Sequence, residues 1–458
     1  MSKPPQEKIM NSLQINTLLP NITVGLISGA ISMSFELSFA ALIFSGRLAN
    51  HLSFGVGLVL FSVAITSILI ILLSSCPQIV VGSATAEMAI LAWTANAIAK
   101  DLSTSATSTE ILVTVIAMIA LTSVLTGVIL LTLGLFRVGN LVRRLPYPVV
   151  GGFMASSGWL LVTGAFEVMV NHPLKIAQVP FLLQPEALIR WIPGLLFALY
   201  LLFLSRQKTH PLAIPISLFS GIALFYLILS FTGTSIAEAS TQGWILEVQK
   251  NQGSWQPLSW SDLLQVHWPA IANQYICIAT VVILTAISLP LKMSGLELVL
   301  KQEIDSNREL KAAGLANLVV GCAGGSLSYH ALSDTILVNK LGGTSRLANW
   351  MGIGVFIAVP ILGSSLLAYF PKLILGGLLL FLGLLVLLEW LYDAWFTLAK
   401  SDYFVVQLIL VTSIAIGFLQ GLLVGWGMTV VLTAIHQYRK RYRKDRQAIK
   451  IFNQNDEK

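Results

Sequence analysis

Apolar runs of about 20 residues, separated by short polar stretches, follow one another along almost the whole chain. Because an α-helix rises about 1.5 Å per residue, a run of about 20 residues crosses the roughly 30 Å hydrocarbon core of a membrane. We also count two shorter, more polar segments, 311–323 and 326–341, because each pairs with a segment of the first half. The pattern predicts fourteen spans, at 20–45, 52–74, 78–99, 108–134, 148–168, 187–205, 211–231, 269–291, 311–323, 326–341, 347–369, 372–390, 402–419 and 421–437.

The composition is that of an all-α polytopic membrane protein. Hydrophobic residues make up 55% of the 458 residues and charged residues only 11%, whereas soluble proteins carry about 25% charged residues. The sequence has no Walker motif, no HExxH and no Gly-x-Ser-x-Gly, so we expect neither an ATP-driven motor nor an enzyme. Cys76, Cys277 and Cys322 lie in apolar segments without metal-site spacing, and we expect no metal or cofactor.

The distribution of Lys and Arg predicts the orientation of the spans. If the N-terminus is cytoplasmic, 22 of the 28 Lys and Arg residues fall on the cytoplasmic side, as the positive-inside rule requires. Both termini are then cytoplasmic, in a multi-pass protein of the plasma (inner) membrane, and the N-terminal residues show no signal-peptide pattern. The predicted regions are a cytoplasmic tail (1–19), a seven-span repeat (20–231), an extracytoplasmic loop (232–268), a second seven-span repeat (269–437) and a basic cytoplasmic tail (438–458).

Two interrupted segments occupy corresponding positions in the two halves. Residues 76–99 and 321–343 each contain a Pro or Gly break followed by an acidic residue in a helical pattern, Glu87 in the first and Asp334 in the second. Seven spans per half is an odd number, so the second half enters from the opposite side and the repeats are inverted. Non-helical backbone at membrane depth is tolerated only where it is buried in protein or lines a cavity. We therefore predict that segments 3 and 10 are short, broken half-helices at a binding site near the midplane.

The starts of these half-helices are the predicted substrate site. Helix N-termini offer unpaired N–H groups and a positive dipole end, which suit an anion. The predicted donors are Gly82, Ser83 and Ala84 in segment 3, and Ser326, Leu327, Ser328 and Tyr329 in segment 10, with Ser333 near by.

Four ionisable residues at membrane depth are the predicted coupling groups: Glu36, Glu87, Asp334 and His330. A charged side chain there costs about 3 kcal/mol on insertion scales and marks a functional pathway. Ionised carboxylates would repel an anion more strongly than a helix end, with about half a unit charge, attracts it. We therefore expect the anion to bind together with a proton or sodium, with Glu36 as the main coupling group. Each residue also has a structural interpretation: the acids can complement helix dipoles, and His330 can be a hydrogen-bonded core histidine.

Three apolar or signature runs resemble the sulfate permease (SulP) family of anion transporters. They are SFELSFAALIFSG at 34–46, NRELKAAGLANLVVGCAGG at 307–325 and GGLLLFLGLLVLLEW at 376–390. The resemblance implies core and gate domains built from seven-plus-seven inverted repeats, usually in a dimer. It also implies a small anion, such as sulfate or bicarbonate, held between the N-termini of spans 3 and 10. The position of Glu36 matches an acidic residue that some members use for proton coupling.

The sequence departs from the family pattern in three ways. Many members carry a Ser-Arg pair in span 10 whose arginine helps to hold the anion, but this chain has Ser333-Asp334. Ser288 stands where cation-coupled members have a glutamate in span 8, and the next acidic residue is Glu297. Members usually end in a cytoplasmic STAS domain, and residues 438–458 are too few to form one, so we expect the membrane domain only.

The leading interpretation is a secondary active transporter of a small anion that works by alternating access. A nucleobase or organic-anion carrier of the same fold is an alternative, favoured by an aspartate in place of arginine. A non-transporting membrane sensor or scaffold is another. The expected partners are a small anion, a proton or sodium ion, membrane lipid and a second copy of the chain, and no nucleic acid.

The predicted topology can be tested by cysteine labelling from each side of the membrane. In a variant without native cysteines, a cysteine introduced at Gln256 should react with an impermeant thiol reagent added outside. A reaction from the cytoplasmic side alone would contradict the predicted arrangement of the spans.

Overall fold

The structure is a computed structural model that describes residues 6–137, 147–172, 174, 178–207, 212–246, 257, 259–343, 345–362, 369–416, 420–421, 423–429 and 431. The predicted C-terminal tail, 438–458, lies outside the described residues, as do parts of the predicted loop 232–268 and of the last predicted span, 421–437.

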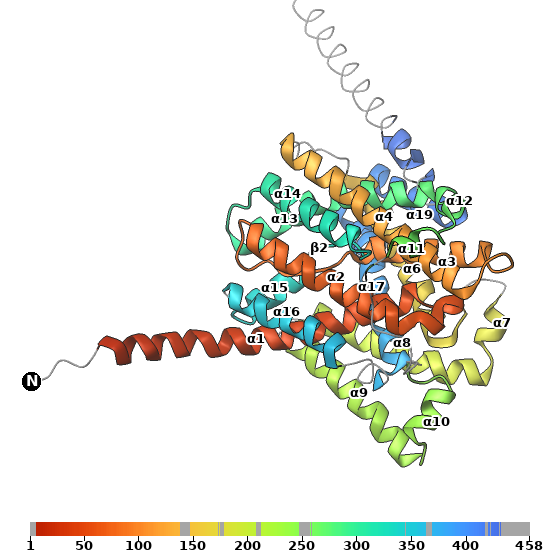
Figure 1. Cartoon of the computed structure of the whole chain (residues 1–458), viewed down its shortest axis with the longest axis horizontal. Coiled ribbons are helices and arrows are strands. Elements are labelled where there is room, and N and C mark those ends of the chain that lie inside the picture. The colour runs from red at the N-terminus through yellow and green to blue at the C-terminus, as the bar shows by residue number, and fades with distance from the viewer. Residues whose placement is uncertain are drawn as a thin grey trace, which may run out of the picture. The chain divides into compact units, whose positions relative to one another are not determined.

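Helices form nearly all of the described structure (Figure 1). The first half contains α1 (Gln6–Ile43), α2 (Leu52–Leu73), α3 (Thr85–Asp101), α4 (Ser108–Leu135), α6 (Tyr147–Val170), α8 (Pro185–Arg206) and α9 (Ala213–Phe231). The second half contains α13 (Tyr275–Leu300), α14 (Ser306–Cys322), α15 (Leu332–Lys340), α16 (Arg346–Leu362), α17 (Lys372–Leu387) and α19 (Lys400–Ala415). Shorter helices are α7 (Val179–Leu182), α10 (Ile236–Thr241), α11 (Trp260–Leu263), α12 (Trp268–Ala272) and α18 (Ala394–Thr397).

Eight of the described helical segments are long and apolar enough to cross a membrane. The chain is therefore a multi-pass membrane protein, as its composition indicated. Five other predicted spans correspond to shorter or more polar helices, α3, α14, α15, α16 and α19, so the count of fourteen stays a prediction. The helix α14 begins before the predicted start at residue 311 because the side chain of Asp305 caps it, accepting hydrogen bonds from the N–H groups of Asn307 and Arg308.

The described chain divides into two compact units. One comprises residues 1–144 and 159–385, and the other comprises residues 145–158 and 386–458. Within the second unit, Val149 at the start of α6 packs against Val405 and Ile409 of α19. This division follows packing and leaves the predicted boundaries between repeats untested.

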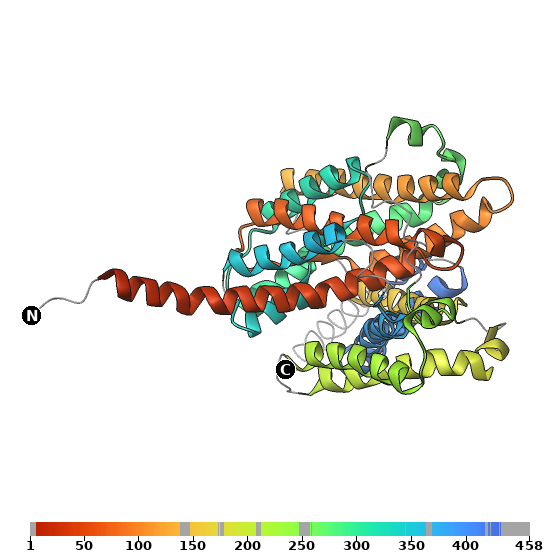
Figure 2. The same ribbon diagram turned by 60° about the horizontal axis from the view of Figure 1, so that its bottom comes forward.

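Glycines allow close helix contacts inside the first unit. The helices α4 and α14 lie side by side in both views (Figures 1 and 2). A Cβ atom built on Gly314 would lie 2.5 Å from the backbone nitrogen of Leu131 in α4, and one on Gly127 would lie 2.6 Å from that of Leu318 in α14. Small residues let membrane helices approach through their backbones, and Gly25 and Gly29 of α1 do the same against α16.

A two-stranded antiparallel sheet lies among these helices. Strand β1 (Val81–Ser83) pairs with β2 (Ser328–His330), with Gly82 opposite Tyr329 at the centre of the register. The strand β1 leads into α3, and β2 leads into α15. An unpaired backbone group in hydrocarbon costs several kcal/mol, and the pairing removes that cost where both chain segments leave the helical conformation. The two interrupted segments predicted from the sequence therefore meet through their backbones.

The α4–α14 contact predicts a glycine-dependent loss of stability. Gly314→Ala should lower the free energy of unfolding by about 1–3 kcal/mol, because the added methyl group collides with backbone atoms that cannot rotate away. The measurement is the thermal unfolding midpoint of the purified protein in detergent.

Gly354→Ala is the matched control, because a Cβ atom there meets no other atom within 4 Å. If Gly314→Ala and Gly354→Ala have the same thermal unfolding midpoint, α4 and α14 are not packed closely enough to exclude a methyl group.

Candidate functional site

The two strand–helix units have the same internal layout. Each has a three-residue strand, then an alanine in extended conformation as the N-cap, Ala84 before α3 and Ala331 before α15, with no side-chain cap. The third residue of each helix is acidic, Glu87 in α3 and Asp334 in α15. The first N–H groups of a helix have no intrahelical partner. Each positive helix end therefore has a carboxylate in its own first turn.

A third carboxylate, that of Glu36 in the last turns of α1, binds at the end of β1. The backbone N–H of Ser83 donates to Glu36 Oε1 at 2.7 Å, and the Ser83 hydroxyl donates to Glu36 Oε2. A Cβ atom on Gly82 would lie 3.2 Å from Glu36 Oε1 and 4.0 Å from Asp334 Oδ2. Gly82 therefore lies beside both carboxylates, and glycine leaves the space next to them open.

The other two acids are held by helices that pack beside them. The Ser32 hydroxyl of α1 donates to Asp334 Oδ2 at 2.6 Å. The Thr285 hydroxyl of α13 lies 3.2 Å from Glu87 Oε1. Glu87 is almost completely buried, with 1% of its surface exposed. Both half-helix acids therefore accept a hydroxyl from a neighbouring long helix.

The buried Tyr329 connects Glu87 to a lysine. Its hydroxyl donates to Glu87 Oε1 at 2.7 Å and accepts from Lys292 Nζ at 3.2 Å. The Lys292 ammonium also lies 4.2 Å from the centre of the Tyr329 ring, within cation–π distance, and it interacts electrostatically with both Glu87 and Asp334. We call Glu36, Glu87, Asp334, Lys292 and Tyr329 the central cluster.

The sequence analysis did not identify Lys292, Ser32 or Thr285 as site residues. Its predicted span ended at residue 291, whereas α13 continues to Leu300 and so holds Lys292 inside the helix. The spacing of these residues along the sequence could have revealed that they share a helix face. Ser32 and Glu36 are one helical turn apart, and Thr285 and Lys292 are two turns apart. The cation that the family carries in span 10 is thus absent from α15, and α13 supplies one instead.

The predicted donors are found in two different settings. Gly82 and Ser83 lie in β1 and Ala84 is the N-cap of α3, and the N–H of Ser83 already donates to Glu36. Residues 326–329 lie before the start of α15 at Leu332, because this stretch is extended and β2 pairs with β1. The N–H groups of Ser326 and Ser328 already donate to the side chains of Ser62 and Asn317. We therefore correct this part of the expected donor set, because Ser326, Leu327 and Ser328 are not at a helix start. Tyr329 contributes its side-chain hydroxyl instead of a backbone N–H. Ser333 lies in the first turn of α15.

His330 belongs to a separate cluster. Successive strand residues face opposite sides, so His330 points away from the face that carries Tyr329. Its Nε2 lies 2.8 Å from Glu309 Oε2, and both side chains are fully buried. Glu309 Oε1 accepts from the N–H and hydroxyl of Ser75. This geometry favours the structural interpretation of His330.

The NREL signature forms the support of the strands. Arg308 Nε donates to the carbonyl of Leu73 at the end of α2, and Glu309 holds His330 as described. Asn317 bonds both the N–H and the carbonyl of Ser328. The signature therefore contributes hydrogen bonds that hold β2 and the end of α2 in place.

The hydroxyl bridge of the central cluster has a measurable energetic role. Tyr329→Phe keeps the ring but removes both hydroxyl bonds to charged groups, so it should lower the free energy of unfolding by about 1–3 kcal/mol. Thermal unfolding of the purified protein measures this change.

Tyr226→Phe is the control, because its hydroxyl bonds only the exposed carbonyl of Tyr369. If Tyr329→Phe unfolds at the same temperature as the parent protein, the bridge between Glu87 and Lys292 contributes nothing to stability.

Two curated relatives match part of the chain. It is 26% identical over 323 residues to the vacuolar basic amino acid transporter of Saccharomyces cerevisiae, a match that covers 69% of this chain and 31% of the yeast protein. It is 27% identical over 267 residues to a probable sulfate transporter of Mycobacterium tuberculosis, a match that covers 57% of this chain and 45% of that protein. The chain thus spans less than half the length of these relatives.

Solved structures show the same fold. The overall structure of SLC26A9 matches with a TM-score of 0.73 at 17% identity, covering 92% of this chain and 66% of that chain. The transmembrane domain of the cyanobacterial bicarbonate transporter BicA matches with a TM-score of 0.64 at 17% identity, covering 88% and 97%. The sequence model of the sulfate permease family matches residues 18–409. This match confirms the resemblance seen in the sequence, and the chain belongs to the sulfate permease family.

Proposed function

We propose that this protein is a secondary active transporter of a small anion, such as sulfate or bicarbonate, and that a proton or sodium ion is carried with it. The observation that carries this proposal is the pairing of β1 with β2. It brings the starts of α3 and α15 to one place, beside Glu36, Glu87, Asp334 and Lys292. A ligand between these helix ends would meet two positive dipole ends and one ammonium group.

The charges of the central cluster support coupling to a cation. The cluster contains three carboxylates and one lysine, and the two helix ends add about half a positive unit each. With all groups ionised, about one negative charge remains, and an anion would increase it. Charges at ~4 Å interact by several kcal/mol at intermediate dielectric. An anion therefore binds only if protons or sodium ions neutralise carboxylates at the same time. Glu36 is our principal coupling group because it touches the start of α3.

The family membership and the names of related proteins support a transported anion. One curated relative is a probable sulfate transporter, and two structural neighbours are a bicarbonate transporter and a murine anion transporter in an inward-facing state. The central cluster differs in detail from the family pattern, so the identity of the anion is part of the proposal.

Alternating access would follow from inverted repeats of seven spans each. The local match between the two strand–helix units supports this arrangement, because strand, N-cap and acidic residue recur in the same order. We propose that the chain forms a homodimer in the plasma membrane, with both termini in the cytoplasm.

A second candidate is a carrier of cationic amino acids. The central cluster retains about one negative charge when ionised, which a ligand with one net positive charge would neutralise without further ions. Such a ligand has a carboxylate for Lys292 and the helix ends, and ammonium or guanidinium groups for Glu36 and Asp334. The yeast relative, which is named as a basic amino acid transporter, supports the same possibility.

Uptake into liposomes that contain the purified protein separates the candidates. We expect uptake of at least one of labelled sulfate, bicarbonate, chloride or a dicarboxylate, stimulated by an inward proton or sodium gradient. Uptake of arginine or lysine alone would select the second candidate, uptake of uracil alone would identify a nucleobase carrier, and no uptake of any of these would favour a sensor.

Coupling is tested in the same liposomes with Glu36→Gln. Glutamine can still accept the N–H bond of Ser83, but it cannot bind or release a proton or neutralise sodium. The variant should therefore lose most of the dependence of uptake on external pH or sodium. Glu303→Gln, at an exposed loop position, is the control. Parent transport that responds to neither pH nor sodium would rule out the coupling and leave exchange.

A further inference from the structure

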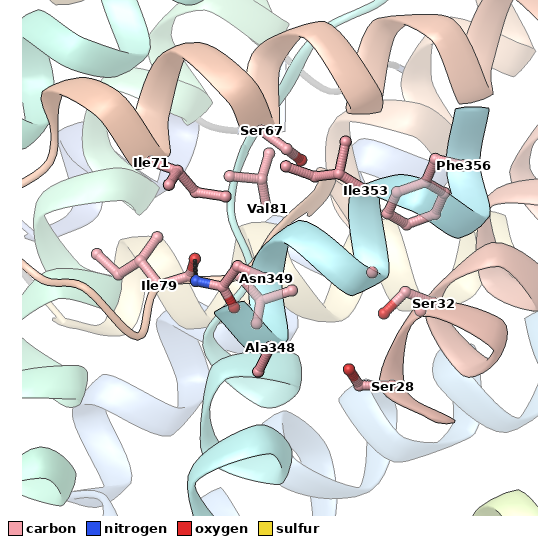
Figure 3. A pocket seen from close by; sticks show the side chains of 13 residues that line it. Ser28, Ser32, Ser67, Ile71, Ile79, Val81, Ala348, Asn349, Ile353 and Phe356 are labelled. Atoms are coloured by element: carbon pink, nitrogen blue, oxygen red, sulfur yellow. Dashed lines mark hydrogen bonds between the residues drawn. The ribbon is translucent and has the colours of Figure 1, made fainter. Parts of the chain in front are cut away.

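A small cavity, with about 20 Å³ of space for the centre of a water molecule, lies in the first unit between α1, α2, α16 and the segment that enters β1. In Figure 3, Ser28 and Ser32 project from α1 on one side of the cavity. Asn349 belongs to α16, and Ser67 projects from α2. The remaining walls are glycines and apolar side chains, including Ile71, which makes the cavity neutral. About 10–15 Å³ of such space is enough for one water molecule, so the cavity has room for about one ordered water.

Three oxygens in this cavity, those of Ser28, Ser32 and Asn349, can accept a hydrogen bond. The Ser28 hydroxyl donates to the carbonyl of Gly25, and the Ser32 hydroxyl donates to Asp334, so both oxygens keep only accepting positions. Asn349 uses its amide nitrogen on the carbonyls of Pro77 and Ile79. Its Oδ1 is buried and has no partner among the described residues, and only 7% of the side chain is exposed.

This set of acceptors selects the kind of ligand. A bare metal ion would lose its hydration shell and gain only a few neutral oxygens, so this cavity does not suit a metal ion. A water molecule needs only two to four polar partners, so the cavity suits water. A buried acceptor without a partner costs about 1–3 kcal/mol, and a water that donates to Asn349 Oδ1 removes this cost. The same water can donate to Ser28 or Ser32 across the cavity.

Ser32 connects the cavity to the central cluster. Its hydroxyl is the direct partner of Asp334 Oδ2, at 2.6 Å, and its oxygen lines the cavity. A proton that arrives on cavity water can pass to Ser32 Oγ while the original Ser32 proton moves to Asp334 Oδ2. Ser32 is again a neutral hydroxyl, the hydronium becomes water, and Asp334 has gained one proton.

We propose that this cavity holds an ordered water that passes a proton through Ser32 to Asp334, separate from the proposed substrate site beside Gly82. The charged groups that face Asp334 are Glu36 from α1 and Lys292 from α13, with Glu87 next to Lys292. In the predicted topology, Ile71 at the end of α2 and Ala348 at the start of α16 belong to the cytoplasmic side. In that topology, a proton that reaches the cavity water would come from the cytoplasmic side. This inference rests on the proposed proton-coupled transport.

Hydration of the cavity is tested without any substrate. In a variant that lacks the native cysteines, the thiol of Ser28→Cys should exchange its proton with D₂O, followed through the infrared S–H band, at least tenfold faster than the thiol of Ser38→Cys. Ser38 is the matched position on α1, because it is buried and its hydroxyl bonds only within its own helix. Equal, negligible rates at both positions would show a dry cavity and overturn the proposal, whatever the protein transports.

The relay is tested in liposomes with the probe that the parent protein takes up, labelled sulfate or labelled arginine. Ser32→Ala should reduce proton-driven uptake about tenfold and reduce exchange of the probe without a pH gradient by a much smaller factor. Ser32→Thr, which retains a hydroxyl, should restore proton-driven uptake, and Ser38→Ala should match the parent.

The two measurements separate the possible failures. Equal loss of driven uptake and exchange in Ser32→Ala would mean that Ser32 acts on the substrate site, and this overturns the relay. Unchanged driven uptake in Ser32→Ala would overturn it as well. If the parent takes up neither probe, the proposed function fails, and the cysteine rates alone decide whether the cavity contains water.

Discussion

The site depends on the backbone pairing between β1 and β2. Two chain segments leave the helical conformation at membrane depth, where an unpaired N–H or carbonyl costs several kcal/mol. Each strand satisfies the other, with Gly82 opposite Tyr329. The pairing fixes where α3 and α15 begin, and it places Glu87 and Asp334 in the first turns of those helices. The signature residues of α14 then hold β2 in position, mainly through Asn317.

The candidate site differs from a site made only of helix N-termini, because its positive groups lie beside carboxylates of the same protein. The positive ends of α3 and α15 are each accompanied by an acid of the same helix, and Glu36 binds the N–H of Ser83. The ammonium of Lys292 is bonded to Tyr329 and interacts with Glu87 and Asp334. A ligand therefore competes with internal charges that already satisfy one another. Adding a proton or cation to one carboxylate changes the net charge of the central cluster by one unit. In the proposed mechanism, this change links binding of the cation to binding of the anion.

Buried hydroxyl groups connect the acids to the long helices. Ser32 joins Asp334 to α1, and Thr285 joins Glu87 to α13. These bonds orient the carboxylates without adding charge, and each acid keeps a second oxygen for other partners. Rotation of α1 or α13 would therefore alter the surroundings of a carboxylate directly. This is a physical route by which helix movement and ligand binding can affect each other.

The sequence by itself determined the membrane class, the family and the two interrupted segments, because apolar run length, Gly and Pro breaks and intramembrane acids are local properties of the chain. It also selected Glu36, Glu87 and Asp334 as candidate coupling acids, which the structure brings together in the central cluster. It could not identify Lys292, Ser32 or Thr285, because their roles depend on which helix faces which carboxylate. It placed the second half-helix too early, since the extension of residues 326–330 depends on a partner strand about 250 residues away. Only the tertiary structure separated His330 from the acids, because neighbouring residues of a strand face opposite sides.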